Sequence, residues 1–163
     1  MSDLSNADSA SATREASEDD RTLIVERVFK APPERVFRAW TDPRILIEWW
    51  GPEGMHTPEH AMDVREGGAW RTVMMNDKGE PHTVSGVYRE IAPPDRLVMT
   101  WAWEQPDGSR GLETLVELSF AATRDGTRLR LVQRLFESAE ARDNHNMGWQ
   151  SSLNCLEQLL AQA

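Results

Sequence analysis

The sequence predicts a small α+β domain in which a curved antiparallel sheet of about six or seven strands surrounds one long C-terminal helix. Three observations predict it: short β-branched segments with alternating apolar residues, turn signals between them, and helical periodicity at the end of the chain. Short turns imply an antiparallel meander, and its apolar face needs another element across it. The last helix is the only predicted element long enough to cover that face.

The start of the chain differs in composition from the rest. Residues 1–20 hold six acidic residues and one arginine, so they carry five of the nine net negative charges. Such a segment buries too little apolar surface to offset the entropy lost on ordering. We therefore predict a disordered acidic tail at residues 1–20 and one folded domain at residues 21–163.

The predicted domain begins with a strand and two short helices. Residues 21–29 are rich in β-branched side chains, and the prolines at 32–33 end this strand. A proline in the first turn of a helix loses no hydrogen bond, which favours a helix over residues 34–40. A second short helix is predicted at 44–49, and a turn-rich loop at 50–54.

Six further strands follow, separated by turns rich in Gly, Pro, Asn and Asp. The clearest alternation places Leu97, Met99, Trp101 and Trp103 on one strand face. The predicted strands cover residues 60–65, 69–75, 82–91, 96–104, 113–122 and 127–136.

The long helix is predicted to begin after Ser138, a suitable N-cap residue. No proline follows it, and one helix face carries a buried stripe of His145, Trp149, Leu153, Leu156 and Leu160. The tryptophans on helical apolar faces are interpreted as structural core: Trp40, Trp49 and Trp149.

Composition excludes several classes of function. No Lys/Arg-rich run exists, so we expect no nucleic-acid partner. No apolar stretch is long enough for membrane insertion. The single cysteine, Cys155, excludes an internal disulfide and indicates a reducing cytoplasm.

Motifs for cofactors, metals and catalysis are missing from the sequence. It has no phosphate-binding glycine loop and no serine-hydrolase signature, so no cofactor and no catalytic residue are assigned. His56 and His60 are four residues apart, but Pro58 between them argues against a helix. They are interpreted as loop histidines, and no metal site is predicted.

Seven segments of the sequence resemble the motifs of a known family and occur in the same order along the chain. The chain is similar to the domain of activators of heat-shock chaperone ATPase, a branch of the START-like, Bet-v-1-like helix-grip superfamily also called SRPBCC. The resemblance extends over residues 21–163. It is carried by the segments 27–32, 39–43, 49–52, 63–70, 86–98, 100–101 with 126–129, and 148–149.

The resemblance implies a curved sheet gripping the C-terminal helix, with a ligand cavity between them. Met and Trp side chains on the strand faces suit a pocket for flat hydrophobic molecules, and a few polar groups would orient the ligand. The same side chains could instead fill the core. The candidate cavity residues are Trp70, Met74, His82, Tyr88, Met99, Trp101, Trp103, Gln133, His145 and Leu153.

The leading hypothesis is therefore a carrier, sensor or sequestering protein for a small hydrophobic or aromatic molecule. One alternative is a chaperone-associated regulator, since the resemblance implies a chaperone as partner. Another is a cyclase or hydrolase that uses the cavity, with a general acid–base pair drawn from His82, His145 and Glu113. The chain is expected to be a monomer or a homodimer.

Overall fold

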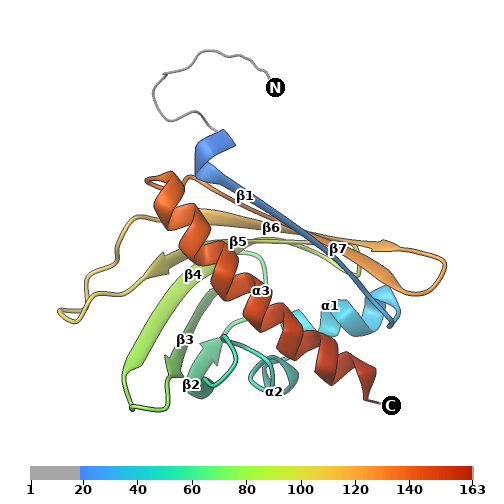
Figure 1. Ribbon diagram of the computed structural model, residues 1–163, viewed down its shortest axis with the longest axis horizontal. Coiled ribbons are helices and arrows are strands. Elements are labelled where there is room, and N and C mark those ends of the chain that lie inside the picture. Colours follow the sequence, from blue (N-terminus) through green and yellow to red (C-terminus); the bar gives the residue numbers. More distant parts are fainter. Residues whose placement is uncertain (1–18, 163) are drawn as a thin grey trace.

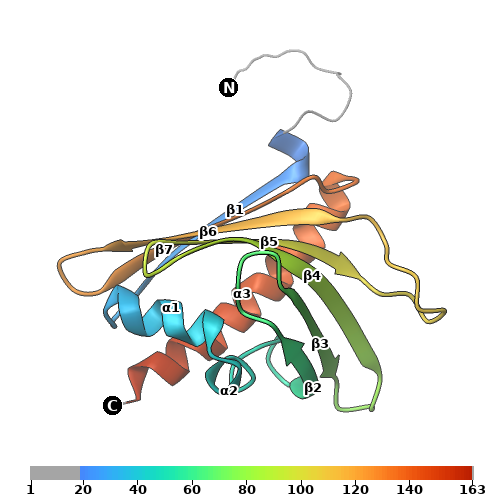
Figure 2. The same cartoon turned by 180° about the vertical axis from the view of Figure 1, so that it is seen from behind.

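Residues 19–162, which the computed structural model describes, form an antiparallel sheet with α-helices on one side of it (Figures 1 and 2). Its seven strands follow the order β1-β7-β6-β5-β4-β3-β2. The strands are β1 (Thr22–Phe29), β2 (His56–Met62), β3 (Ala69–Met75), β4 (Pro81–Ala92), β5 (Arg96–Trp103), β6 (Thr114–Ala122) and β7 (Thr127–Arg134).

The helices lie between β1 and β2 and at the end of the chain. A 3-10 turn, η1 (Asp19–Arg21), precedes β1, and α1 (Pro33–Thr41) and α2 (Pro43–Leu46) follow it. The last helix, α3 (Ala139–Ala161), runs diagonally across the concave face of the sheet (Figure 1). The predicted α+β class and the order of elements are confirmed. Most of the predicted tail, residues 1–18, lies outside the described residues.

The N-terminal cap of α3 is the predicted one. The side chain of Ser138 accepts a hydrogen bond from the Ala141 N–H at 3.1 Å. At the other end of the helix, the Arg35 guanidinium donates to the Leu160 carbonyl at 2.8 Å. These contacts satisfy backbone groups that a helix end otherwise leaves unpaired.

One polar side chain on the inner face of β1 connects the sheet to α3. The Arg27 guanidinium donates to the Asn154 carboxamide at 2.7 Å and to the Gln150 carboxamide at 2.8 Å. Arg27 interrupts the apolar face formed by Leu23, Val25 and Phe29, and these contacts explain the interruption.

Both His56 and His60 lie in the edge strand β2, which covers His56–Met62 and not the predicted 60–65, so their interpretation as loop histidines is wrong. Pro58 falls where the pairing register shifts, between His56 opposite Met75 and Glu59 opposite Val73. A proline is tolerated at such an irregularity on an edge strand, where its missing N–H breaks no ladder hydrogen bond.

The last strand ends two residues earlier than predicted. Leu135 has a positive φ of 79° and is exposed, so β7 stops at Arg134. The reversal turns Phe136 into the core, where it is 2 % exposed. Helix α2 is also shorter than predicted, because it ends at Leu46 and residues 47–49 form a turn.

Candidate functional site

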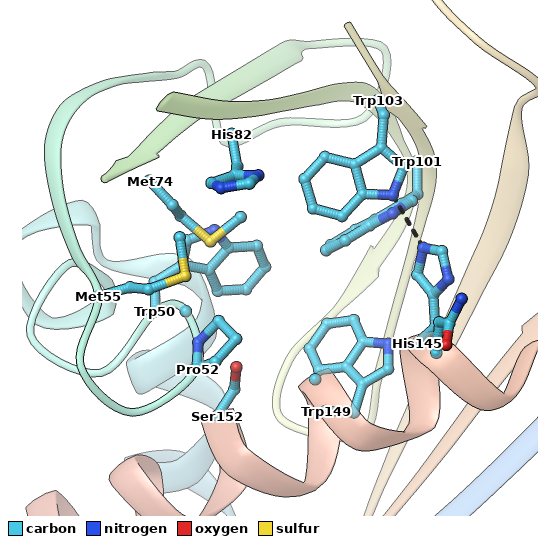
Figure 3. A pocket seen from close by; sticks show the side chains of 13 residues that line it. Trp50, Pro52, Met55, Met74, His82, Trp101, Trp103, His145, Trp149 and Ser152 are labelled. Atoms are coloured by element: carbon cyan, nitrogen blue, oxygen red, sulfur yellow. Dashed lines mark hydrogen bonds between the residues drawn. The ribbon is translucent and has the colours of Figure 1, made fainter. Parts of the chain in front are cut away.

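A cavity of about 380 Å³ lies between the sheet and the N-terminal half of α3 (Figure 3). Its floor is formed by β3, β4 and β5, and the loop after α2 closes one side. The walls are largely apolar. The residues that line it are Trp50, Gly51, Pro52, Met55, Met74, His82, Trp101, Trp103, Asn144, His145, Gly148, Trp149 and Ser152.

Three of the four cavity tryptophans use their indole N–H inside the protein. Trp50 donates to the Thr72 hydroxyl at 2.9 Å, and Trp149 donates to the Gln133 carboxamide oxygen at 2.7 Å. The Trp103 N–H donates to the His145 ring at 2.9 Å. Since these N–H groups are already bonded, the rings present carbon faces to the cavity.

Trp50, in the loop after α2, packs against tryptophans of both the core and the cavity wall. Its ring centroid lies 5.9 Å from that of Trp40, 5.5 Å from Trp49, 5.8 Å from Trp101 and 6.0 Å from Trp149. Such edge and tilted contacts fix ring orientation and add to the energy of burial. A wall held in this way cannot collapse easily into the space beside it.

Five of the ten predicted cavity residues line this cavity. Met74 projects from β3, and His82 projects from β4 at the exposed side (Figure 3). Trp101 and Trp103 come from β5, and His145 comes from α3. The structure thus brings together side chains from four elements far apart in the sequence.

Three other predicted residues face a separate, much smaller space. Trp70, Tyr88 and Met99 line a gap of about 10 Å³ on the far side of Trp50, which borders both spaces. The Trp50 ring therefore separates them from the main cavity. Burial raises the pKa of the Tyr88 phenol, so this side chain is neutral.

The last two predicted residues lie in the core. Leu153 is fully buried and packs with the aliphatic cluster. Gln133 is fully buried too, and it donates to the Thr114 hydroxyl at 2.8 Å while accepting from Trp149. Both ends of its carboxamide are therefore bonded inside the protein, and Gln133 serves as the hydrogen-bond acceptor of the Trp149 N–H.

The cavity also contains residues from two segments that are not among the predicted site residues. The first is the turn-rich loop, which contributes Trp50, Pro52 and Met55. The sequence feature that points to this loop is Trp50, a large aromatic residue in a turn-rich segment. The second is the α3 face beside the predicted stripe, where Asn144 and Gly148 lie one turn apart. Small side chains at helical spacing next to a bulky stripe leave room between helix and sheet.

Trp149 is the clearest single difference from the expectation. It was interpreted as core, and it is indeed 5 % exposed, but it also lines the cavity. Trp40 and Trp49, at 1 % and 2 % exposed, lie in the core as predicted. Whether a tryptophan lies only in the core or also lines the cavity depends on the path of the loop after α2. Helical periodicity does not predict that path.

His145 is neutral in this arrangement. Its Nε2 accepts from Trp103, an N–H that can only donate, so the ring proton lies on Nδ1 and is donated to the Ala141 carbonyl at 2.8 Å. Burial lowers the pKa of His145, and the Ala141 hydrogen bond partly offsets this. Neither ring nitrogen is left free to accept a proton from a bound molecule.

Among residues 19–162, no Asp, Glu, Lys or Arg side chain lines the cavity. Within residues 19–162, no three His, Cys, Asp or Glu side chains lie close enough together to hold a metal ion. Over the same residues, no helix is both long and apolar enough to cross a membrane. The site is therefore best described as an uncharged aromatic cavity.

A family model described as "Activator of Hsp90 ATPase homolog 1-like protein" matches residues 30–161. The chain belongs to this family. The match spans every strand after β1 and all three α-helices, so the family's domain includes the whole cavity. The helix-grip resemblance stated from the sequence is confirmed.

Solved structures of the family share the fold over nearly their full length. The AHSA1 protein from Silicibacter pomeroyi is 37% identical, with 86% of this chain and 97% of that chain covered and a TM-score of 0.81. A protein from Chromobacterium violaceum is 31% identical, with 88% and 99% covered and a TM-score of 0.77. The chain has no match among the curated proteins.

Proposed function

We propose that this protein binds a small hydrophobic or aromatic molecule in the cavity between α3 and the sheet. The observation that carries the proposal is the set of Trp rings whose N–H groups are bonded inside the protein, so that ring carbons face a space of about 380 Å³. Concave, apolar spaces with a few polar groups are the usual form of small-molecule sites.

Two methionines make the proposed site adaptable. Met55 and Met74 lie opposite the Trp103 and Trp149 rings across the cavity (Figure 3). Methionine is flexible and polarisable, so it can adjust to ligands of different outline while the tryptophans stack on their flat faces. Such a site would suit a carrier, sensor or sequestering role. Because Cys155 is the single cysteine, we keep the cytoplasm as the proposed location.

The test is ligand binding by wild type and by a variant with a filled cavity. Gly148 lines the cavity, and a Cβ built on it meets no atom within 4 Å, so Gly148→Phe places a ring in the space. The matched control is Met147→Phe, one residue away and 71% exposed. Native mass spectrometry with flavonoids, polyketides and lipids should detect a complex with wild type and M147F, and none with G148F. Equal binding by all three proteins would contradict the proposal.

A second candidate is suggested by the description of the matched family, which names an activator of Hsp90 ATPase. In that role the chain would bind a chaperone and change its ATPase rate. Adding the purified protein to an Hsp90-class chaperone tests this directly. A rate change that persists in G148F would assign the activity to a surface other than the cavity.

A further inference from the structure

Most polar groups around the cavity already have partners in the protein. Three indole N–H groups are bonded to Thr72, Gln133 and His145, and both ring nitrogens of His145 are used. Asn144 and His82 are exposed and lie where water reaches them. These groups therefore offer a buried ligand little polar recognition.

Among the described residues, two groups at the cavity lack a partner, the Trp101 indole N–H and the Ser152 hydroxyl. The indole N–H can only donate, whereas the hydroxyl can both donate and accept. Ser152 lies on α3, is 6% exposed, and lines the cavity. Figure 3 shows its hydroxyl oxygen directed into that space, beside Pro52.

The neighbouring serine shows the difference. The Ser151 hydroxyl accepts a hydrogen bond from the Glu53 N–H at 2.7 Å, which connects α3 to the loop after α2. Ser151 is thus used for the architecture, while Ser152 is directed into the cavity. A hydroxyl can both donate and accept, so Ser152 can meet a ligand hydroxyl or a ligand carbonyl.

The charges near Ser152 restrict the ligand further. None of the Lys and Arg side chains in the described part of the chain lines the cavity, and the Glu53 carboxylate belongs to the adjacent loop. A carboxylate or phosphate on the ligand would therefore be buried without a cation, which is strongly unfavourable. A neutral polar group bonded to Ser152 avoids that cost.

We propose that the ligand is an uncharged, mainly aromatic molecule with one hydroxyl or carbonyl group, which hydrogen-bonds to the Ser152 hydroxyl. This inference rests on the proposed function, because it specifies the chemistry of a ligand in the same cavity. It makes Ser152 the residue that fixes ligand orientation, with the Trp rings and methionines enclosing the remainder.

The experiment compares three probes of the same ring system: naphthalene, 2-naphthol and 2-naphthoate. Dissociation constants are measured from the indole N–H signals of the ¹⁵N-labelled chain. One hydrogen bond to an otherwise unpaired hydroxyl should make 2-naphthol bind about five-fold more tightly than naphthalene, and 2-naphthoate should bind most weakly. Ser152→Ala should remove the preference for 2-naphthol and leave naphthalene binding unchanged.

The control variant is Ser119→Ala, which removes a hydroxyl from a β6 position whose neighbours Leu118 and Phe120 face the core. It should keep the wild-type preference. If 2-naphthol and naphthalene bind equally in wild type, or if S152A keeps the preference, the inference is wrong and the proposed function stands. If no probe binds while the screen of flavonoids, polyketides and lipids detects a complex, the inference is wrong and the proposed function stands; if neither detects binding, both are contradicted.

Discussion

Two regions of the space between sheet and α3 are built on different principles. The closed region contains aliphatic side chains, each 0 to 1% exposed: Leu118, Leu129, Leu131, Leu153 and Leu156. The open region is the cavity, whose walls are mainly Trp and Met side chains. Both regions meet on one helix, where Ser152 lines the cavity and Leu153 is fully buried.

The comparison shows how a small domain keeps a space open. Branched aliphatic side chains interdigitate and fill volume. Indole rings are rigid, and in the open region three of them are fixed by hydrogen bonds to Thr72, Gln133 and His145. A fixed ring cannot rotate to close the gap beside it, so the cavity follows from the anchors behind the rings as much as from the rings themselves.

The largest effect is expected in the closed region. Leu156→Ala should lower the free energy of unfolding by about 3 kcal/mol, since it leaves a void in a tightly packed cluster. Met55→Ala, at a partly buried position that already borders the cavity, should cost less than about 1 kcal/mol. Urea denaturation of both variants provides the measurement. Equal losses would remove the distinction between the two regions.

The next largest effect on stability is expected at Gln133, whose hydrogen bond fixes the Trp149 ring. Gln133→Met keeps the side-chain volume but leaves the Trp149 N–H without its acceptor, so we expect a loss of about 2 kcal/mol. Gln105→Met, at an exposed position, is the matched control and should change stability by less than about 0.5 kcal/mol. Urea denaturation again measures both. A Q133M protein as stable as the control would mean that Trp149 does not depend on its anchor.

Acidic pH should lower the contribution to stability of His145, whose hydrogen bond fixes the Trp103 ring. The folded-state pKa of His145 is lowered by burial, so protonation favours the unfolded chain. Its contribution to stability is fully present above about pH 6.5, the ordinary histidine pKa, and is lost as the pH falls below it toward the folded-state value.

Unfolding free energies between pH 7.5 and pH 5 should therefore decrease more steeply for wild type than for His145→Gln. The other three histidines remain in that variant, so the difference isolates His145. Identical slopes would show that the Trp103–His145 hydrogen bond does not depend on the neutral ring.

The smallest effect is expected at a glycine beside the cavity, and Gly126 in the β6–β7 turn serves as the closely packed reference. Gly148 borders the cavity, where an added Cβ meets no atom within 4 Å, so Gly148→Ala should stabilise α3 by about 0.5–1 kcal/mol. At Gly126, an added Cβ would lie 1.9 Å from the Phe29 carbonyl oxygen, so Gly126→Ala should destabilise the protein. Thermal unfolding distinguishes the two signs. A destabilised G148A would mean that the space beside α3 is smaller than the structure indicates.

The fold could be predicted from the sequence further than the site could. Alternation in β5 and the stripe on α3 are local periodicities, and they gave the elements and the concave face. The division of that face depends on Trp50, which enters from a loop and separates Trp70 from the main cavity. Loop paths are set by tertiary contacts such as the Trp50–Thr72 hydrogen bond, which no periodicity encodes.

Polar residues on apolar faces show the same limit. Gln133 interrupts an apolar strand face and His145 extends the apolar stripe of the last helix, and both are predicted ligand contacts. The structure gives both of them a tryptophan partner instead, and only His145 also borders the cavity. The sequence does not distinguish Ser152 from Ser151, because both are serines in the same helix and only their surroundings in the fold differ.

The most direct test of the account is a crystal structure of the chain with saturating 2-naphthol. The account predicts that the naphthol ring lies in the cavity, with the Trp103 and Trp149 rings on one side and Met55 and Met74 opposite, and with its hydroxyl within hydrogen-bond distance of the Ser152 oxygen. A cavity closed by its own side chains, or a probe bound only on the outer surface, would contradict it.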